Sequence, residues 1–235
     1  MRNIAVLPRM SAIAVAVGVA LAGCTQNVSG SAVKGPAPAG ADKPLQESSL
    51  DDILLSVNDV SDIVGGTDLQ VGNSTQDLVD NSEDIDKPEC LGAFYAAEQQ
   101  VYQGSGWKAV RDQIIREPGD SKQHWVEQTL VLFANADKAL NFLDKSRDSW
   151  KKCQQNSVTI QGSSSSYDWD FGRVQNPSET MISIDADQKD SNGWVCEHAM
   201  SAVSNLIVEA FACGNGVGDQ GRQLVEKIVS NAKAK

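Results

Sequence analysis

Apolar positions along the chain follow two different periods, and each period predicts one kind of element. From Asn135 to Cys153, and again after Asp219, apolar residues recur at every third or fourth position, which is typical of a helix with one buried face. The residues that form these two faces are Leu140, Leu143, Trp150 and Cys153 in the first segment and Leu224, Val225, Ile228 and Val229 in the second. Both segments are therefore predicted to be helices that pack against a core.

Two shorter helices are predicted from residues that favour helix ends. Ser56 is a good N-terminal cap, and the pair Gly65-Gly66 can end the helix that follows it. Asp86 and Glu89 have the spacing of a capping box, so we expect a second short helix from there to Ala97.

The remaining apolar stretches are short, and turn residues separate them, as is typical of strands. They are 107–116, 124–133, 158–161, 169–174, 180–185 and two stretches within 194–214 that meet at Ser204-Asn205. Runs of strands and helices that do not alternate regularly indicate an α+β fold, in which helices pack on an antiparallel sheet.

The N-terminal residues predict an exported lipoprotein. An uncharged apolar run ending at Ala22 follows two arginines, as in a signal peptide, and it is shorter than the roughly 20 apolar residues of a membrane-spanning helix. Residues 21–24, Leu-Ala-Gly-Cys, resemble the lipobox at which a bacterial signal peptidase cleaves before an acylated cysteine. We therefore expect a signal peptide over residues 1–23, with palmitate-type chains on Cys24 that anchor the protein to the outer face of the plasma membrane. The alternative is an ordinary signal peptide that happens to contain a cysteine.

Composition separates a linker from a folded domain. Residues 25–46 consist largely of Gly, Ala, Ser and Pro and contain almost no large apolar residue, so they have little to bury. We expect residues 24–47 to be the lipidated cysteine with a flexible linker, and residues 48–235 to form one domain. The formal net charge of −11 excludes a basic surface of the kind that binds nucleic acid.

Four cysteines remain beyond the lipidation site, and in an exported protein they are expected to form disulfides. If Ser204-Asn205 is the turn of a hairpin, Cys196 and Cys213 lie opposite each other on its strands, where a cross-strand bridge can form. Cys90 is then left to pair with Cys153, which would link the second predicted helix to the third. The alternative is a zinc site made of four cysteines, but the sequence has no C-x-x-C pair.

The sequence does not match the patterns of a catalytic centre or a metal site. It has no G-x-S-x-G motif, and His124 and His198 lie on predicted strands without a visible nucleophile partner. Residues 185–190 begin like a calcium loop but lack an oxygen ligand and the glycine where that loop needs them, so we expect a hairpin turn. No enzyme activity, cofactor or metal is therefore predicted, and Trp169 and Trp194 are interpreted as core residues.

Six short motifs occur together, and in combination they resemble a known family. They are PECLG at 88–92, GSGW at 104–107, HWVEQ at 124–128, WKKC at 150–153, GWVC at 193–196 and ACG at 212–214. Together they are similar to the extracellular sensor domain of the mycobacterial Ser/Thr kinase PknH, from about Leu50 to the end of the chain. The resemblance implies an α+β domain with two disulfides, the same cysteine pairs, and a cleft that takes a ligand.

These observations favour a mycobacterial cell-surface lipoprotein that binds or senses a small ligand or a component of the cell envelope, without catalytic activity. A lipidated cysteine and a tether would replace the kinase and its membrane helix, so this copy would bind outside the cell but not itself signal inward. The alternative is a carrier or chaperone for lipid or cell-wall material, and an unrecognised hydrolase is a third possibility. A carrier needs an apolar cavity of roughly several hundred Å3, whereas a sensor cleft would be more open and more polar.

A polar patch on one predicted hairpin is the candidate ligand site. We pair the strands 107–116 and 124–133 in the register in which Arg116 faces His124. In that register four polar residues share one otherwise apolar face, namely Arg111, Gln113, Glu127 and Thr129. If this face floors a cleft, Arg111 would meet an anionic or carbonyl group of the ligand. The alternative is that Arg111 and Glu127 form an ion pair that is solvated or covered by a helix.

Overall fold

The computed structural model describes residues 43–119, 123–162 and 164–235. The predicted signal peptide, Cys24 and the linker up to residue 42 lie outside these ranges. Leu45 is buried, and its backbone N–H donates a 2.7 Å hydrogen bond to the side-chain oxygen of Asn205. The folded domain therefore begins a few residues before the predicted boundary at residue 48.

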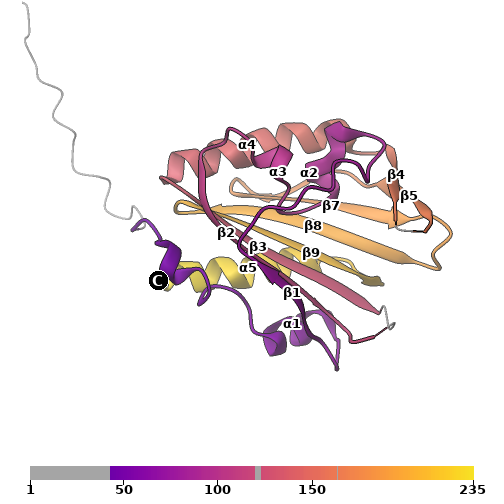
Figure 1. The fold of residues 1–235 in the computed structure, drawn as a ribbon, viewed down its shortest axis with the longest axis horizontal. Coiled ribbons are helices and arrows are strands. Elements are labelled where there is room, and N and C mark those ends of the chain that lie inside the picture. The colour runs from indigo at the N-terminus through magenta and orange to yellow at the C-terminus, as the bar shows by residue number, and fades with distance from the viewer. Residues whose placement is uncertain (1–42, 120–122, 163) are drawn as a thin grey trace, which may run out of the picture. The chain divides into compact units, whose positions relative to one another are not determined.

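A nine-stranded antiparallel sheet runs through the centre of the described domain, with the order β1-β2-β3-β9-β8-β7-β5-β4 and with β6 paired to β7 (Figure 1). The strands are β1 (Gln70–Thr75), β2 (Trp107–Arg116), β3 (His124–Phe133), β4 (Ser157–Gln161), β5 (Ser166–Phe171), β6 (Gln175–Ser178), β7 (Met181–Gln188), β8 (Trp194–Val203) and β9 (Leu206–Asn215). The predicted α+β class with an antiparallel sheet is confirmed.

Helices cover both faces of this sheet (Figure 1). One face carries α4 (Ala136–Cys153) together with two short helices, α2 (Leu91–Phe94) and α3 (Gln99–Tyr102). The other face carries α5 (Gln220–Lys233) and α1 (Val57–Val64). Two short 3-10 turns, η1 (Glu47–Ser49) and η2 (Pro88–Cys90), complete the described elements.

Capping residues fix three ends of two helices, α1 and α4. The Ser56 hydroxyl accepts a hydrogen bond from the Asp59 N–H at the start of α1, and Gly65 ends that helix with a φ of 80°. The side chain of Asn135 accepts a hydrogen bond from the Lys138 N–H at the start of α4. The helix predicted from Asp86 to Ala97 was too long, because the chain becomes extended immediately after α2.

The two long hairpins differ in how well their register could be predicted. In the β8–β9 hairpin Val203 faces Leu206 and Cys196 faces Cys213, as predicted. In the β2–β3 hairpin Arg116 faces Trp125 rather than His124, because an irregularity between Trp107 and Ala109 shifts the pairing by one residue. Since side chains alternate between the faces of a strand, this shift changes which residues share a face.

The sheet separates two apolar cores. The core beneath α4 and α2 contains the largest buried side chains of the domain, among them Trp150, Tyr102 and Phe133. The core beneath α5 contains smaller residues, such as Val126, Val208 and Leu224.

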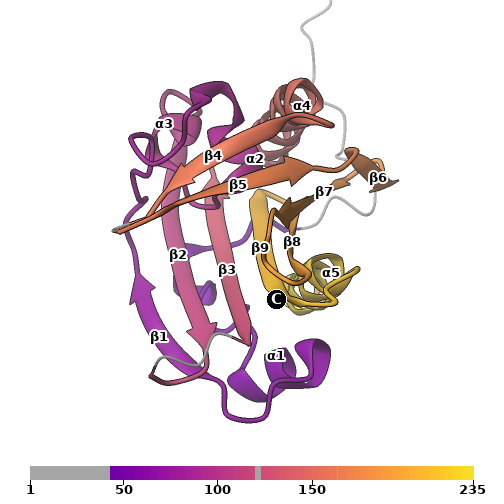
Figure 2. The same ribbon diagram turned by 90° about the vertical axis from the view of Figure 1, so that its right-hand side faces the viewer.

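The end of the sheet formed by β5 and β4 bends, so that these two strands lie over the face that bears α2 and α4 (Figure 2). This bend makes room for a cavity between β4–β5 and the centre of the sheet.

Candidate functional site

The four predicted ligand residues do not converge on one site. Arg111 and Gln113 lie on the face of the sheet that bears α5, whereas Glu127 and Thr129 lie on the opposite face, with α2 and α4. The one-residue shift in the β2–β3 register causes this separation. The predicted polar patch was therefore wrong as a single site.

Arg111 is held by the segment that precedes α1. Its Nε atom donates a 2.9 Å hydrogen bond to the Asp51 carboxylate, and its Nη1 atom lies 3.5 Å from the Glu47 carboxylate. The predicted Arg111–Glu127 ion pair does not form, because the two side chains lie on opposite faces. Arg111 thus fastens the start of the domain to the sheet, away from the face that bears Glu127.

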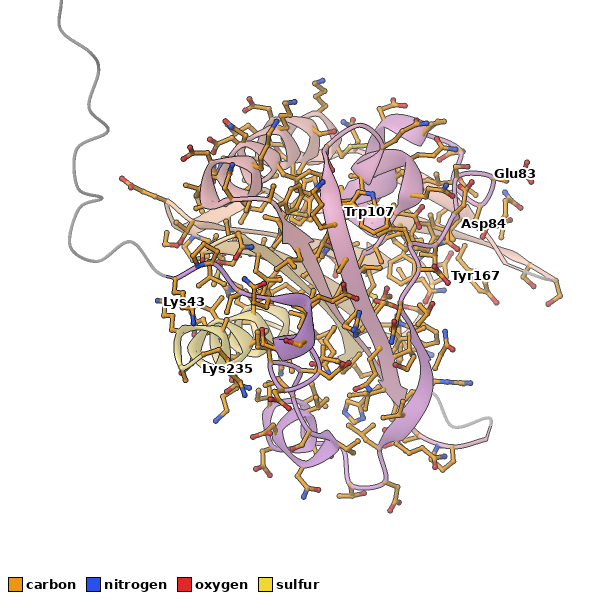
Figure 3. All side chains as sticks on the ribbon, turned by 60° about the vertical axis from the view of Figure 1, so that its left-hand side comes forward. Lys43, Glu83, Asp84, Trp107, Tyr167 and Lys235 are labelled. Atoms are coloured by element: carbon orange, nitrogen blue, oxygen red, sulfur yellow. A yellow bond between two sulfur atoms is a disulfide. The ribbon has the colours of Figure 1, made fainter. Side chains whose placement is uncertain are left out.

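A cavity of about 350 Å3 opens on the face that bears Glu127. Its walls are aromatic, and they come from α2, β3, β5, β8, β9 and the residue after α2: Phe94, Tyr95, Trp125, Tyr167, Trp169, Trp194 and Phe211. Ile160 of β4, Glu127 and the Cys196–Cys213 disulfide complete the lining. Tyr167 is 45% exposed and lies on the side of the molecule opposite Lys43 and Lys235 (Figure 3).

The aromatic rings support one another around Phe94. The centre of its ring lies 5.1 Å from that of Trp169, 5.9 Å from that of Phe211 and 4.9 Å from that of Tyr95, all in edge-to-face geometry. Trp169 is buried, as predicted for a core residue, but Trp169 and Trp194 also line the cavity, which the sequence interpretation did not foresee.

Two disulfides stabilise the elements around the cavity, and both pair as predicted. Cys196 and Cys213 are directly opposed on β8 and β9, with 4.0 Å between their Cα atoms. Cys90 of η2 is bonded to Cys153 at the end of α4, with 5.6 Å between their Cα atoms. The second bond holds the segment that carries Phe94 and Tyr95 against α4.

Glu127 is the acidic residue of the cavity lining, and it lies beside a second carboxyl group, that of Asp112. Burial, followed by the negative charge of Asp112, raises the pKa of Glu127 well above its ordinary value. Burial also raises the pKa of Asp112, although a 2.5 Å hydrogen bond donated by the Thr129 hydroxyl opposes this change. The two carboxyl groups therefore influence each other, and the negative charge of Asp112 favours the protonated form of Glu127.

A third acidic side chain, Glu209, extends this polar group toward the helices. The Tyr102 hydroxyl donates a 2.5 Å hydrogen bond to one of its oxygens, and the other oxygen lies 3.0 Å from Nε2 of His198. Because Nδ1 of His198 lies 3.2 Å from the Ala93 carbonyl oxygen, Nδ1 carries a proton, and a further proton lies between Nε2 and Glu209. His198 is therefore a fully buried partner of Glu209, and the pair has no net charge.

Glu98 is the fourth buried acid near the cavity. Burial raises its pKa to about 7, and hydrogen bonds from the backbone and side chain of Asn81 partly oppose that effect. The negative charge of Glu98 contributes to the raised pKa of Glu127. Four carboxyl groups thus lie close enough to influence one another on this face of the sheet.

Other parts of the described domain are weaker candidates for a functional site. A hollow of about 330 Å3 lies beside α4, between Pro88 and Ser105, and its mixed lining contains no buried carboxyl group. Within the described ranges, no group of three or more His, Cys, Asp or Glu side chains has the arrangement of a metal site. In the same ranges, no helix has both the length and the apolar character needed to span a membrane.

No single motif could reveal the cavity, because its lining comes from segments spread between residues 94 and 213. The sequence nevertheless contained a signal. The HWVEQ motif includes Trp125 and Glu127, and the GWVC motif includes Trp194 and Cys196. These two motifs, which carry the family resemblance, therefore supply four of the residues that line the cavity.

Comparisons with known proteins give the same family. Residues 45–231 match the model of the PknH-like extracellular domain. The chain is 35% identical over 194 residues to the Serine/threonine-protein kinase PknH of Mycobacterium bovis and of Mycobacterium tuberculosis. The match covers 83% of this chain but 32% and 31% of those kinases, so this chain spans about a third of their length.

A solved structure agrees with this assignment. The crystal structure of the extracellular domain of PknH from Mycobacterium tuberculosis matches with a TM-score of 0.79 and 34% sequence identity. The match covers 83% of this chain and 100% of that one. The similarity thus lies in the extracellular part of the kinase, and this chain belongs to the PknH-like extracellular domain family.

Proposed function

We propose that this chain is a lipid-anchored protein of the cell envelope whose domain binds a small ligand outside the membrane, without catalytic activity. The family domain is extracellular in PknH, which supports a location outside the cytoplasm. The lipobox-like residues before Cys24 support the anchor. The observation that carries the proposal is the aromatic cavity with Glu127 in its lining.

The cavity has the character of a small-molecule site. Its volume of about 350 Å3 lies near the lower end of the roughly 300–1,000 Å3 that is typical of such sites. A mostly apolar wall with few polar groups is also typical, because the wall contributes affinity and the polar groups orient the ligand. Here the polar group is Glu127, and the walls are held by two disulfides.

A carrier of lipid or cell-wall material is the second candidate, because the cavity wall is more apolar than we expected of a sensor cleft. Phe94, Trp169 and Phe211 present no charged group to it. The small volume favours a small ligand, or one group of a larger molecule, over a whole lipid with two acyl chains. The mass of the bound molecule separates the two functions.

Native mass spectrometry of the full chain purified from its own host tests the proposal. We expect a bound molecule of small mass that dissociates on unfolding. An Ile160→Trp variant would fill the cavity from β4 and should lose this molecule, whereas Leu140→Trp adds the same bulk to an exposed position on α4 and should retain it. A bound lipid that Ile160→Trp removes would establish the carrier function instead. Folded protein without any bound molecule, before and after incubation with host extract, would overturn both functions.

A further inference from the structure

The cavity combines aromatic walls with an acidic side chain, and this combination indicates which class of ligand it can bind. Aromatic rings present the negative face of their quadrupole to a bound group, so they attract cations. Trp125, Trp169 and Trp194 are three of the cavity's rings, and tryptophan binds cations most strongly among aromatic side chains. The walls alone would accept either a cation or a neutral apolar group.

The charges around the cavity distinguish a cationic ligand from a neutral one. Glu127 lines the cavity, and Asp112 lies beside it, while no lysine or arginine is among the lining residues. Glu98 adds negative potential from behind the lining, since its charge acts on Glu127. The imidazole of His198 neutralises Glu209 but lies in contact with that group and not with Glu127.

Two positively charged side chains that contact the lining or its strands, Arg116 and Lys189, already have partners. The Arg116 guanidinium lies 5.8 Å from the centre of the Trp125 ring. Lys189, which follows β7, lies 3.1 Å from the Asp170 carboxylate of β5. At the rim, the negative charge of Asp84 acts on Tyr95 and raises the pKa of its phenol, after the larger effect of burial. Figure 3 shows Asp84 and Tyr167 on the same side of the molecule.

We infer that the cavity binds an organic cation, an amine or quaternary ammonium group that the aromatic rings surround and that Glu127 faces. The inference rests on the proposed function of this cavity and specifies its ligand class. The bound cation supplies the positive charge that the cavity lining lacks. Within the described ranges no group of three or more His, Cys, Asp or Glu side chains could hold a metal ion, so an organic cation fits the cavity better than a metal ion.

The test compares two probes of nearly identical shape with the full chain. The first probe is choline, and the second is its uncharged isostere, in which a tert-butyl group replaces the trimethylammonium group. Tryptophan fluorescence reports binding, because three tryptophans line the cavity, and calorimetry at low millimolar concentration checks the affinities. We expect choline to bind about tenfold more tightly than the isostere, which is the size of a desolvated cation–π contact.

Two variants assign the preference to the cavity. Glu127→Gln keeps the size of the side chain and removes its charge, so choline should bind about tenfold more weakly while the isostere binds as before. Glu226→Gln removes one carboxylate from the exposed side of α5, on the other face of the sheet, and should change neither affinity. Tyr167→Leu alters an exposed ring at the cavity mouth and should weaken choline binding without disturbing the core.

Three outcomes would overturn the inference. If the isostere binds as tightly as choline, the cavity is a ligand site for neutral molecules, and only the cationic class is wrong. If Glu127→Gln binds choline as well as the parent while remaining folded, the carboxylate does not recognise the cation. If neither probe binds, the cationic class is again wrong, and the native mass of the host-purified protein still decides whether the cavity is a ligand site at all.

Discussion

Thr129 and Asp112 face each other across β3 and β2, and the threonine hydroxyl donates a 2.5 Å hydrogen bond to the aspartate carboxylate. Both side chains are buried. A carboxylate in such surroundings depends on its donor, because burial alone favours the protonated form and raises the pKa of Asp112. This cross-strand pair therefore helps to keep negative charge beside Glu127.

Replacing Thr129 by valine keeps the shape of the side chain and removes the donor. We expect the free energy of unfolding at neutral pH to fall by about 1–3 kcal/mol, because the buried Asp112 loses its partner. Urea denaturation measures the change. Thr159→Val is a matched control, since Thr159 donates a 2.8 Å hydrogen bond to Asp168 across β4 and β5 in an exposed setting. There the change should stay within about 0.5 kcal/mol, and equal effects of both variants would contradict the prediction.

The strand register that places Thr129 opposite Asp112 also explains why the candidate site was predicted incorrectly. The positions of β2 and β3 could be predicted, because both strands are rich in apolar and β-branched residues. Their register depends on the irregularity between Trp107 and Ala109 and on the connection that includes Gly119. Neither feature has a signature in the hydrophobic pattern, and an error of one residue moves every side chain to the other face.

The β8–β9 hairpin could be predicted more fully, because its connection is a two-residue turn. Ser204 adopts a positive φ of 50°, and Asn205 uses its side chain to bond the Phe133 and Leu45 carbonyl oxygens. A turn of two residues fixes the register of the hairpin. The opposed positions of Cys196 and Cys213 could therefore be predicted from the turn alone. Strands β1 and β6 were missed because their exposed residues have no apolar periodicity.

The two disulfides are expected to contribute unequally to stability. They close loops of 17 and 63 residues, and loop entropy predicts about 3 kcal/mol for Cys196–Cys213 and about 4 kcal/mol for Cys90–Cys153. Double alanine variants of each pair, unfolded in urea, measure the difference. The larger loss is expected for the Cys90/Cys153 variant, and a free thiol in the oxidised parent protein would contradict the pairing itself.

Stability is expected to fall as the pH rises from about 4.5 to about 7. Glu98 and Glu197 are buried, and burial raises the pKa of each from an ordinary value of 4.5 to about 7. In this range the native state therefore binds more protons than the unfolded state, so the free energy of unfolding decreases with pH. Carboxyl groups whose pKa is lowered, such as that of Asp59, change the free energy of unfolding only at pH values below this range.

A glutamine at position 98 resembles the protonated acid at every pH, so it isolates one of these contributions. Glu98→Gln should reduce the loss of stability between about pH 5 and about pH 8 by an amount on the order of 2 kcal/mol. Urea denaturation at both pH values measures this loss of stability. The control is Glu226→Gln, which changes an exposed residue of α5. An unchanged slope in Glu98→Gln would mean that Glu98 titrates in the native protein as it does in the unfolded chain.

The proposed lipid anchor requires a single thiol, that of Cys24. Cys24→Ala is expected to abolish acylation and release the protein from the detergent phase, because in the proposed anchor this one residue carries the acyl chains. Globomycin should make the unprocessed precursor accumulate. The double variant Cys90→Ala/Cys153→Ala also removes cysteines but should remain in the detergent phase. Equal partitioning of Cys24→Ala and the parent protein would disprove the anchor.

Arg111 provides the last prediction, because its role follows from the face on which it lies. Its ion pairs with Asp51 and Glu47 connect β2 to the segment before α1, and both acidic partners are largely exposed. Arg111→Ala should therefore cost only about 1 kcal/mol. The segment stays attached through Leu50 and Ile53, which are fully buried.

The effect should be local, and hydrogen exchange can detect it. Amides of residues 45–51 should exchange faster in Arg111→Ala. Binding of the proposed ligand should stay unchanged in native mass spectra, because the cavity lies on the other face of the sheet. Lys235→Ala breaks the 2.9 Å pair with Asp52 at the surface and should leave exchange in these residues as it was. Loss of the ligand from a folded Arg111→Ala protein would mean that the two faces of the sheet are coupled. The N-terminal segment would then contribute to binding across β2, despite its distance from the aromatic walls.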